Sequence, residues 1–356
     1  MKNFILFQRR KKYKHIPTIL SFITPPPTFL LKMFVSPPSL QKEQLLVFTI
    51  GSDEKKLENL KFTSGFQTTD IQYVKKTPWT GYIDKITTMI EILEKRCRPK
   101  DIVCFVDAYD VLCFADEEEI HRKFKEYDCK ILLSSELNPY PPKFQSQYDF
   151  LEYQIQEWEW EEWERKEQSR EEEKISHLSS PFEGGGGVFS TLFKYVNSGG
   201  YIGYADALLK MLKWKSVKEI TAICEDGGDQ TYFSLYYLEH ALQDKRKWIR
   251  LDEKQEIFQS MYRIDFTDFY FKGGRLCNNV LHTQPCFAHF NGFGIYGNKI
   301  VSLETEKQEN VYEVFIDKMI KSMAQPNILI PLNYRVLFFL FYNGSYQFNL
   351  PQLPCV

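Results

Sequence analysis

The chain has 356 residues, with a hydrophobic content of 43% and an aromatic content of 16%. This composition excludes an intrinsically disordered chain, and the length allows one large α/β domain with tails or two small domains. The formal net charge is −2 at pH 7, so there is no overall positive field and we expect no nucleic-acid partner.

The ordered chain is predicted to begin after residue 42. Residues 1–42 are rich in proline, contain the basic run Arg9-Arg10-Lys11-Lys12 and show no periodicity, so we predict a tail there. Unbroken apolar runs at residues 45–50 and 101–106 predict strands that are buried on both faces.

Strand and helix patterns alternate through the first part of the chain. Helical spacing of apolar residues at 54–66 recurs at 83–93, after a short strand pattern at 71–74. An acidic helix start at 115–119 precedes a further strand at 130–134. Such alternation predicts an α/β fold with a doubly wound sheet.

Residues 146–187 differ in character from their surroundings. A charged stretch rich in tryptophan predicts a helix, and Trp160 and Trp163 share one face of it because they are three residues apart. Two interpretations stay open, a lid or partner-binding helix and a surface helix pinned by its tryptophans. Four glycines at 184–187 predict a hinge. We therefore expect one catalytic domain over 43–300, interrupted by this insertion.

Residues 301–356 are predicted to form a C-terminal extension. A helical pattern covers 311–323, and the apolar run 336–342 is far shorter than the roughly 18 residues that a membrane span needs. No other stretch reaches that length, so we predict no membrane span. The eight cysteines form no C-x-x-C pair, which disfavours a zinc ribbon. Cys104 and Cys113 are expected in the core as small apolar residues.

Two aspartates follow the strand predicted at 101–106. Asp107 and Asp110 stand in the sequence Phe-Val-Asp-Ala-Tyr-Asp, and open α/β sheets bind ligands beyond the carboxyl ends of their strands. Paired carboxylates suit a hard divalent cation that also holds a diphosphate. They equally suit the capping of a turn or of the next helix, so this motif alone leaves both interpretations open.

Three further segments carry candidate site residues. Residues 195–203, with three glycines, predict a turn, either a plain tight turn or one at which the backbone closely approaches a ligand. Asp226 and Asp229 open a helical pattern, where acidic residues are ordinary but also suit the steering of an acceptor hydroxyl. His289 begins the sequence His-Phe-Asn-Gly, and a single histidine is more often structural than a metal ligand.

These four motifs in this order resemble the glycosyltransferase domain of the procollagen lysyl hydroxylases. The similarity covers about residues 44–295 and is most specific at 105–112, 195–203 and 289–292. It implies a GT-A-type fold that moves a sugar from a UDP-sugar donor. None of the six histidines begins an H-x-D or H-x-E, so only the sugar-transfer part is resembled and no Fe(II) site is expected.

The resemblance also implies roles for individual residues. It assigns Mn²⁺ ligation to Asp107, Asp110 and His289, and stacking on the uracil ring to Tyr109. The residues it places near the transferred sugar are Asp229, Asp226 and Asn197. The residues it places around the donor are Thr49, Lys85, Tyr109, Asn291, Gly292 and Tyr140.

The implied donor is UDP-glucose or UDP-galactose, and the implied acceptor is hydroxylysine or galactosyl-hydroxylysine of a collagen-like protein. The family implies the lumen of the endoplasmic reticulum, whereas a cytoplasmic location applies if the N-terminus is not a signal. Two alternatives remain open, a metal-dependent nucleotidyltransferase or phosphodiesterase and an inactive glycosyltransferase-like module that binds a partner through its insertion. The oligomeric state is also left open.

Overall fold

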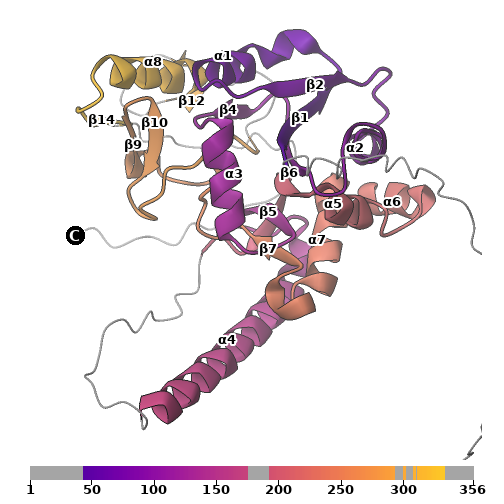
Figure 1. The fold of residues 1–356 in the computed structure, drawn as a ribbon. Coiled ribbons are helices and arrows are strands. Elements are labelled where there is room, and N and C mark those ends of the chain that lie inside the picture. The colour runs from indigo at the N-terminus through magenta and orange to yellow at the C-terminus, as the bar shows by residue number, and fades with distance from the viewer. Residues whose placement is uncertain (1–42, 175–191, 293–299, 302–307, 310, 333–356) are drawn as a thin grey trace, which may run out of the picture. The chain divides into compact units, whose positions relative to one another are not determined.

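A six-stranded sheet forms the centre of the fold. The computed structural model describes residues 43–174, 192–292, 300–301, 308–309 and 311–332. The strand order is β2-β1-β3-β6-β5-β7, and β6 runs antiparallel to both neighbours while the other pairs are parallel (Figure 1). The strands are β1 (Leu45–Gly51), β2 (Ile71–Lys75), β3 (Ile102–Val106), β5 (Ile131–Glu136), β6 (Tyr195–Tyr204) and β7 (Ile249–Leu251).

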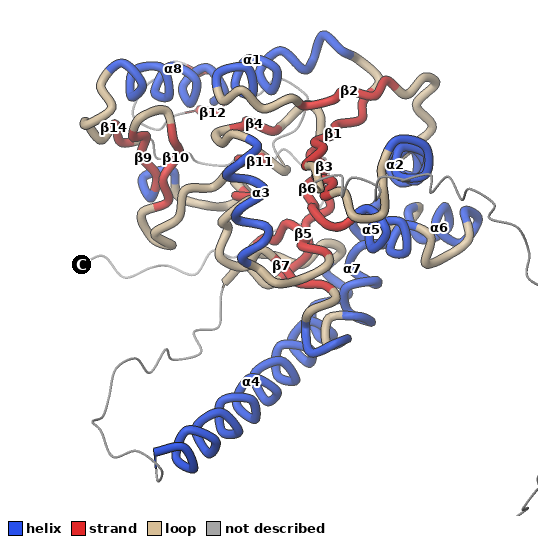
Figure 2. Tube along the Cα trace, in the orientation of Figure 1, coloured by secondary structure: helices blue, strands red, loops and turns tan. Residues whose placement is uncertain are grey.

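Helices and strands alternate along the chain, as Figure 2 shows. The α-helices are α1 (Glu58–Phe66), α2 (Ile83–Arg96), α3 (Glu117–Glu126), α4 (Gln145–Lys174), α5 (Ala205–Leu212), α6 (Val217–Cys224), α7 (Gly228–His240) and α8 (Val311–Ala324). The 3₁₀ turns are η1 (Glu54–Leu57), η2 (Pro142–Phe144), η3 (Gln243–Arg246) and η4 (Phe266–Asp268). The predicted α/β alternation is therefore confirmed, with the strands and helices of the first half near their expected bounds.

Both faces of the central sheet are buried because its strands are apolar at successive positions. Phe48 of β1 and Phe105 of β3 pack into a core with residues of α2, α5 and α7. The alternate positions Val47 and Cys104 pack into a second core with residues of α1 and α3. Side chains of a strand point to opposite faces in turn, so one apolar run fills two cores. Cys113 also lies in the second core, so both cysteines are core residues as predicted.

A smaller sheet brings a late segment of the chain beside the end of β3. It contains β4 (Val111–Cys113), β8 (Phe258–Ser260) and β11 (Phe287–His289), in the order β4-β11-β8. His289 pairs with Val111 in the antiparallel register, and the amide of Phe290 donates to the carbonyl of Asp110 at 2.8 Å. The backbone ladder thus places residue 289 next to residue 110.

The remaining short strands lie in two further sheets. The order β10-β9-β14 joins β9 (Phe269–Lys272), β10 (Arg275–Asn278) and β14 (Ile330–Pro331). The other pair is β12 (Ile300–Val301) with β13 (Gln308–Glu309). The helical pattern predicted at 311–323 is confirmed as α8, whereas the apolar run 336–342 lies outside the described residues.

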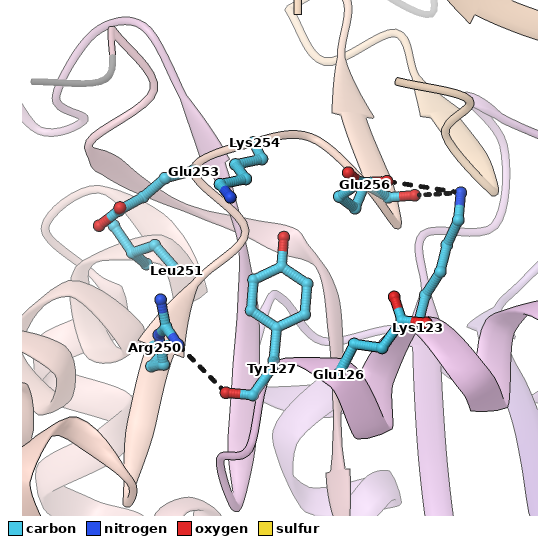
Figure 3. A pocket seen from close by; sticks show the side chains of 8 residues that line it. All are labelled: Lys123, Glu126, Tyr127, Arg250, Leu251, Glu253, Lys254 and Glu256. Atoms are coloured by element: carbon cyan, nitrogen blue, oxygen red, sulfur yellow. Dashed lines mark hydrogen bonds and ion pairs between the residues drawn. The ribbon is translucent and has the colours of Figure 1, made fainter. Parts of the chain in front are cut away.

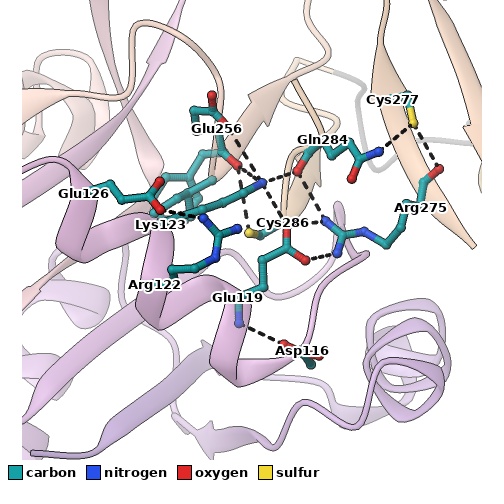
Figure 4. Close-up of polar contacts among 12 residues, drawn as sticks. Asp116, Glu119, Arg122, Lys123, Glu126, Glu256, Arg275, Cys277, Gln284 and Cys286 are labelled. Carbon is teal, nitrogen blue, oxygen red and sulfur yellow. Dashed lines mark hydrogen bonds and ion pairs between the residues drawn. The ribbon is translucent and has the colours of Figure 1, made fainter. Parts of the chain in front are cut away.

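A polar cluster joins α3 to β10 and to the segments just before β8 and β11 (Figure 4). Arg275 pairs with both carboxylate oxygens of Glu119, and Lys123 lies 2.9 Å from the same carboxylate. Lys123 is buried and also donates to the carbonyls of Glu256 and Gln284. A buried ammonium needs such partners, so this cluster fixes the position of β8 and β11 against the central sheet.

The segment 195–203 is a strand, so the prediction of a turn there is wrong. Gly199 and Gly200 both lie in β6. Glycine is needed at these positions because the neighbouring side chains leave no room for a Cβ. A Cβ on Gly199 would lie 2.0 Å from Cε1 of His289, and one on Gly200 would lie 2.7 Å from Cδ1 of Phe258. The glycines therefore permit close approach, but the group that approaches the backbone is a side chain of this chain.

Helix α4 extends well beyond the rest of the fold (Figure 1). It confirms the helix predicted in the insertion over 146–174, while the four glycines at 184–187 lie outside the described residues. Among the described residues, no helix combines the length and the apolar character that crossing a membrane requires.

Candidate active site

Three side chains with metal-binding chemistry meet at the end of β3. Nε2 of His289 lies 3.2 Å from Oδ2 of Asp110 and 3.8 Å from Oδ2 of Asp107. One ligand atom from each of the three lies within 4.8 Å of the others. The two aspartates flank the turn between β3 and β4, and the histidine arrives on β11. The ordering of the small sheet therefore assembles residues that are 179 positions apart in the sequence.

A lysine forms ion pairs with two aspartates of the site. Nζ of Lys85, on α2, lies 2.6 Å from Oδ1 of Asp107 and 3.4 Å from Oδ2 of Asp229. Asp229 begins α7, and its Oδ1 accepts a hydrogen bond from the hydroxyl of Ser198 at 3.2 Å. Lys85 therefore joins the aspartate at the end of β3 to the aspartate at the start of α7.

Burial and charge shift the pKa values of these groups in opposite directions. Burial alone would lower the pKa of Lys85, but Asp107 and Asp229 outweigh it and raise that pKa. For His289 burial also acts to lower the pKa, while the charge of Asp110 and the hydrogen bond to it raise it. Burial and the nearby carboxylates raise the pKa of Asp107. For Asp110 burial is outweighed by His289, which lowers the pKa. The carboxylates around His289 thus favour the charged form of its imidazole.

Asn197 orients the histidine ring. Its Oδ1 lies 3.0 Å from Nδ1 of His289 and accepts a second hydrogen bond, also 3.0 Å long, from the amide of Gly199. Because this oxygen only accepts, Nδ1 of the ring carries a proton and Nε2 is the nitrogen left to face Asp107 and Asp110. Metal-binding histidines are commonly oriented by such a hydrogen bond on the other ring nitrogen.

Glu136, at the end of β5, connects the polar side chains of the site and is not among the candidate residues that the sequence predicted. Its Oε2 accepts from Asn291 at 2.7 Å and from Asn197 at 3.4 Å, and its Oε1 accepts from Gln230. The side chain is buried, and burial raises its pKa to about 7 although the three amides act to lower it. A signal was present, because a carboxylate ends the apolar strand 131–136, yet the partners of that carboxylate follow only from the tertiary structure.

The residues expected around the donor base lie at the end of β1. The phenol oxygen of Tyr109 accepts hydrogen bonds from the amides of Ser52 and Asp53, at 2.7 and 2.8 Å. Gly51 makes this possible, because a Cβ there would lie 2.6 Å from that oxygen. The hydroxyl of Thr49 is buried and has no hydrogen-bond partner among the described residues. It is therefore a polar group for which a bound molecule would provide a partner.

The remaining candidates differ in their surroundings. Asn291 is buried, and its Oδ1 accepts from the hydroxyl of Ser260 at 2.9 Å, so it belongs to the network of Glu136. Asp226 stands apart, because its carboxylate is mostly exposed and pairs with Lys143. The last two candidates are Tyr140, which is 51% exposed, and Gly292, which has a φ of +76°.

The three clustered side chains fit a divalent cation. Two carboxylate oxygens and one imidazole nitrogen suit ions such as Mn²⁺. Metal–ligand distances of about 2.1 Å place neighbouring ligands roughly 3 Å apart, which is near the separations from Nε2 to the two carboxylates. Only Oδ1 of Asp107 is engaged by Lys85, so its Oδ2 faces the histidine.

A separate cavity of about 200 Å³ lies between the end of α3 and β7 (Figure 3). None of the site residues described above lines it. Its wall carries three basic and three acidic side chains, namely Lys123, Arg250, Lys254, Glu126, Glu253 and Glu256. The balanced charge gives this cavity no preference for an anion or a cation.

Comparison with known proteins places this geometry in a family. A family model described as the PLOD GT domain matches residues 41–154 and 189–301. Together with the α/β sheet and the site at the end of β3, this match defines a glycosyltransferase domain. The chain belongs to the PLOD GT domain family, as the resemblance of its motifs indicated.

Individual relatives agree with this assignment. The chain is 26% identical over 265 residues to the uncharacterized protein R699 of Acanthamoeba polyphaga mimivirus, covering 70% of this chain and 47% of that one. It is 25% identical over 291 residues to procollagen-lysine,2-oxoglutarate 5-dioxygenase 1 of Gallus gallus, covering 75% and 34%. It is 27% identical over 216 residues to the multifunctional procollagen lysine hydroxylase and glycosyltransferase of Caenorhabditis elegans, covering 58% and 23%. The chain thus spans less than half the length of each of these relatives.

Among solved structures, the apo form of mouse xyloside xylosyltransferase 1 matches with 9% identity and a TM-score of 0.34, covering 70% of this chain and 98% of that one. A TM-score this low adds no support for a particular fold or substrate.

Proposed function

We propose that residues 43–300 form a Mn²⁺-dependent hexosyltransferase that uses a UDP-sugar. The donor is UDP-glucose or UDP-galactose, and the acceptor is hydroxylysine or galactosyl-hydroxylysine of a collagen-like polypeptide. The observation that carries the proposal is the convergence of Asp107, Asp110 and His289 at the end of a parallel strand in a PLOD GT domain. The names of relatives that modify procollagen lysine supply the acceptor class.

A cation held by Asp107, Asp110 and His289 would supply Lewis-acid neutralisation of the charge that develops on departing UDP. Lys85 adds a buried positive charge to the same region, because its raised pKa keeps the ammonium protonated. Asn197 keeps Nε2 of His289 turned toward the carboxylates. The protein therefore provides positive charge at a fixed position without needing to protonate the leaving group.

Asp229 is the residue we propose to act near the transferred sugar. Ser198 and Lys85 fix both of its carboxylate oxygens. A fixed carboxylate either stabilises the positive charge on the sugar or orients the acceptor hydroxyl. D229N distinguishes these roles, because the amide retains hydrogen bonding but lacks the charge.

The base of the donor is proposed to stack on Tyr109. The two backbone amides that bind its phenol oxygen hold the ring beside the end of β1. The unpartnered hydroxyl of Thr49, buried on the same strand, would then bind the uridine. Binding therefore uses the first strand for the nucleoside and the end of β3 for the diphosphate, as expected for an open α/β sheet.

The test is release of UDP from UDP-glucose and UDP-galactose with Mn²⁺ or with EDTA, with and without a hydroxylysine-containing collagen peptide. We expect release from one donor, dependent on Mn²⁺ and raised by the peptide. Production of UMP instead of UDP would support a nucleotidyltransferase or phosphodiesterase. Absence of both release and UDP binding would contradict the proposal in favour of an inactive binding module.

A further inference from the structure

The first turns of α4 pack on the body of the protein, and the later turns do not. Tyr148 and Leu151 are buried in the main core, and Ile155 packs against it. Glu159, one turn further along, forms an ion pair with Arg246. These positions recur at three and four residues, so they form one face of the helix. Beyond them α4 runs away from the body (Figure 1).

The opposite face of α4 carries exposed aromatic side chains. Phe150, Tyr153 and Trp160 are 63%, 61% and 57% exposed, and their spacings of three and seven residues place them on one side of the helix. Trp163 is 53% exposed, and its ring centroid lies 5.1 Å from that of Trp160. Large exposed aromatic side chains grouped in this way are typical of an interaction surface.

Glutamates are interleaved with these rings. Glu157 lies seven residues after Phe150 and three before Trp160, so it shares their face. Glu164 follows seven residues later, and Nε1 of Trp160 donates to it at 2.9 Å. Acidic residues outnumber basic ones by eight to two over 145–167. The surface is therefore both aromatic and strongly negative.

This charge disfavours a second copy of the chain as the occupant. Positions 150, 153, 157, 160 and 164 follow the spacing of a coiled-coil seam. Pairing two such helices would bring Glu157 and Glu164 of each copy into the seam between them. Like charges buried in that way are costly, whereas a cationic partner would neutralise them.

We propose that this surface, formed by Phe150, Tyr153, Glu157, Trp160, Trp163 and Glu164, docks a lysine-bearing, proline-rich segment of the acceptor polypeptide. Ammonium groups bind over aromatic rings and beside carboxylates. Prolines in an extended polyproline conformation pack on exposed aromatic rings. The inference rests on the proposed transferase function and adds to it a second contact with the acceptor. The outer part of this surface lies in the gap between the two stretches of the family match, 41–154 and 189–301.

The start of α4 adjoins the candidate site. Gln230, which donates to Glu136, also donates to the carbonyl of Tyr140 at 3.4 Å. The amide of Val196, next to Asn197, donates to the phenol oxygen of Tyr148 on α4 at 3.2 Å. From Gln145 to Trp163 a helix rises roughly 27 Å at 1.5 Å per residue. A polyproline segment of about nine residues covers that length at 3.1 Å per residue. The surface therefore contacts only acceptors that extend well beyond the modified lysine.

The first test measures binding of fluorescent Gly-Pro-Lys repeats to the full chain by anisotropy. Peptides of about six and about 20 residues are compared, because a peptide held at the candidate site needs the greater length to reach Trp163. We expect W160A/W163A to weaken binding of the long peptide about tenfold and to leave the short one unchanged. E157Q/E164Q is expected to weaken the long Gly-Pro-Lys peptide severalfold, and a Gly-Pro-Glu repeat is expected to bind poorly to the unaltered chain.

The matched control is F62A/F66A on α1. Phe62 and Phe66 are also an exposed aromatic pair, with centroids 4.8 Å apart, but they lie on another helix. An equal loss of affinity in this variant would overturn the proposal. Equal binding of the lysine and glutamate repeats would overturn it as well, and so would a concentration-dependent dimer that W160A/W163A abolishes.

Sugar transfer then separates this inference from the proposed function. In W160A/W163A we expect KM for a long acceptor to rise while kcat, and KM for a short acceptor, stay unchanged. A chain that transfers no sugar but binds the long lysine peptide through α4 would contradict the transferase and retain the docking surface. A chain that transfers sugar with unchanged KM in W160A/W163A would contradict the docking surface alone.

Discussion

The cluster around Asp107 is held by contacts from several elements, whereas the outer part of α4 is held by contacts within one helix. In the cluster, the single side chain of Asn197 contacts His289, Gly199 and Glu136, which lie on three different strands. On outer α4, Trp160 bonds only one turn along its own helix, to Glu164. Cation binding and sugar transfer need ligands fixed to fractions of an ångström, which requires several elements. A surface that accepts an extended chain needs only the right chemistry on one face.

The largest effect is expected from removing the carboxylates of the cluster. D107A/D110A should lower kcat/KM for sugar transfer by about 10³-fold or more, since both proposed oxygen ligands are lost. Mn²⁺ should raise the melting temperature of the unaltered chain but not of the variant. Thermal melts with Mn²⁺ and with EDTA measure this independently of activity. D317A, which removes an exposed carboxylate on α8, is the control. If the double variant retained Mn²⁺-dependent transfer, this would contradict the assignment of Asp107 and Asp110 as metal ligands.

The next effect concerns the close approach of β6 to His289. G199A should destabilise the fold by about 3 kcal/mol and disturb the histidine, because the added Cβ would lie 2.0 Å from Cε1 of the ring. G65A is the matched control, since nothing lies within 4 Å of a Cβ at that position in α1. We expect G65A to stabilise by roughly 0.5–1 kcal/mol. Urea unfolding of both variants checks this, and equal stability of the two would refute the contact.

The third prediction concerns the effect of pH on stability through Glu136. Burial raises the pKa of this side chain from 4.5 to about 7. Between these values the unfolded chain has released the proton that the folded chain keeps, so stability falls as pH rises from 4.5 to 7. The contribution is up to about 3 kcal/mol, at 1.36 kcal/mol per pKa unit. E136Q has no proton to lose there, and its unfolding free energy should lack this slope. An unchanged slope in E136Q, measured by urea titration at several pH values, would assign it to other groups.

The smallest effect is expected on outer α4. W160A/W163A should change the unfolding free energy by less than about 0.5 kcal/mol, because both rings are more than half exposed. The same urea titration measures it beside G199A. A loss of several kcal/mol would show that the tryptophans pack against the protein, and α4 would then resemble the cluster rather than contrast with it.

Much of the fold followed from local patterns. The apolar runs at 45–50 and 101–106 predicted buried strands because a strand between two helical layers is apolar at every position. The helix in the insertion followed from its composition. The turn predicted at 195–203 was wrong, since glycines also occur where another side chain needs the space of a Cβ. The pattern alone could not show that the approaching group was His289.

The sequence by itself determined the alternation of strands and helices and, through its resemblance to a family, the candidate ligands Asp107, Asp110 and His289. Only the tertiary structure decided that Glu136 joins Asn197, Gln230 and Asn291, and that Asp226 stays outside the cluster. The physical reason is the range of the interactions. Periodicity reports which face of one element is buried, whereas side-chain hydrogen bonds within the site join residues 31 to 179 positions apart. Such pairs become neighbours only when the sheets assemble.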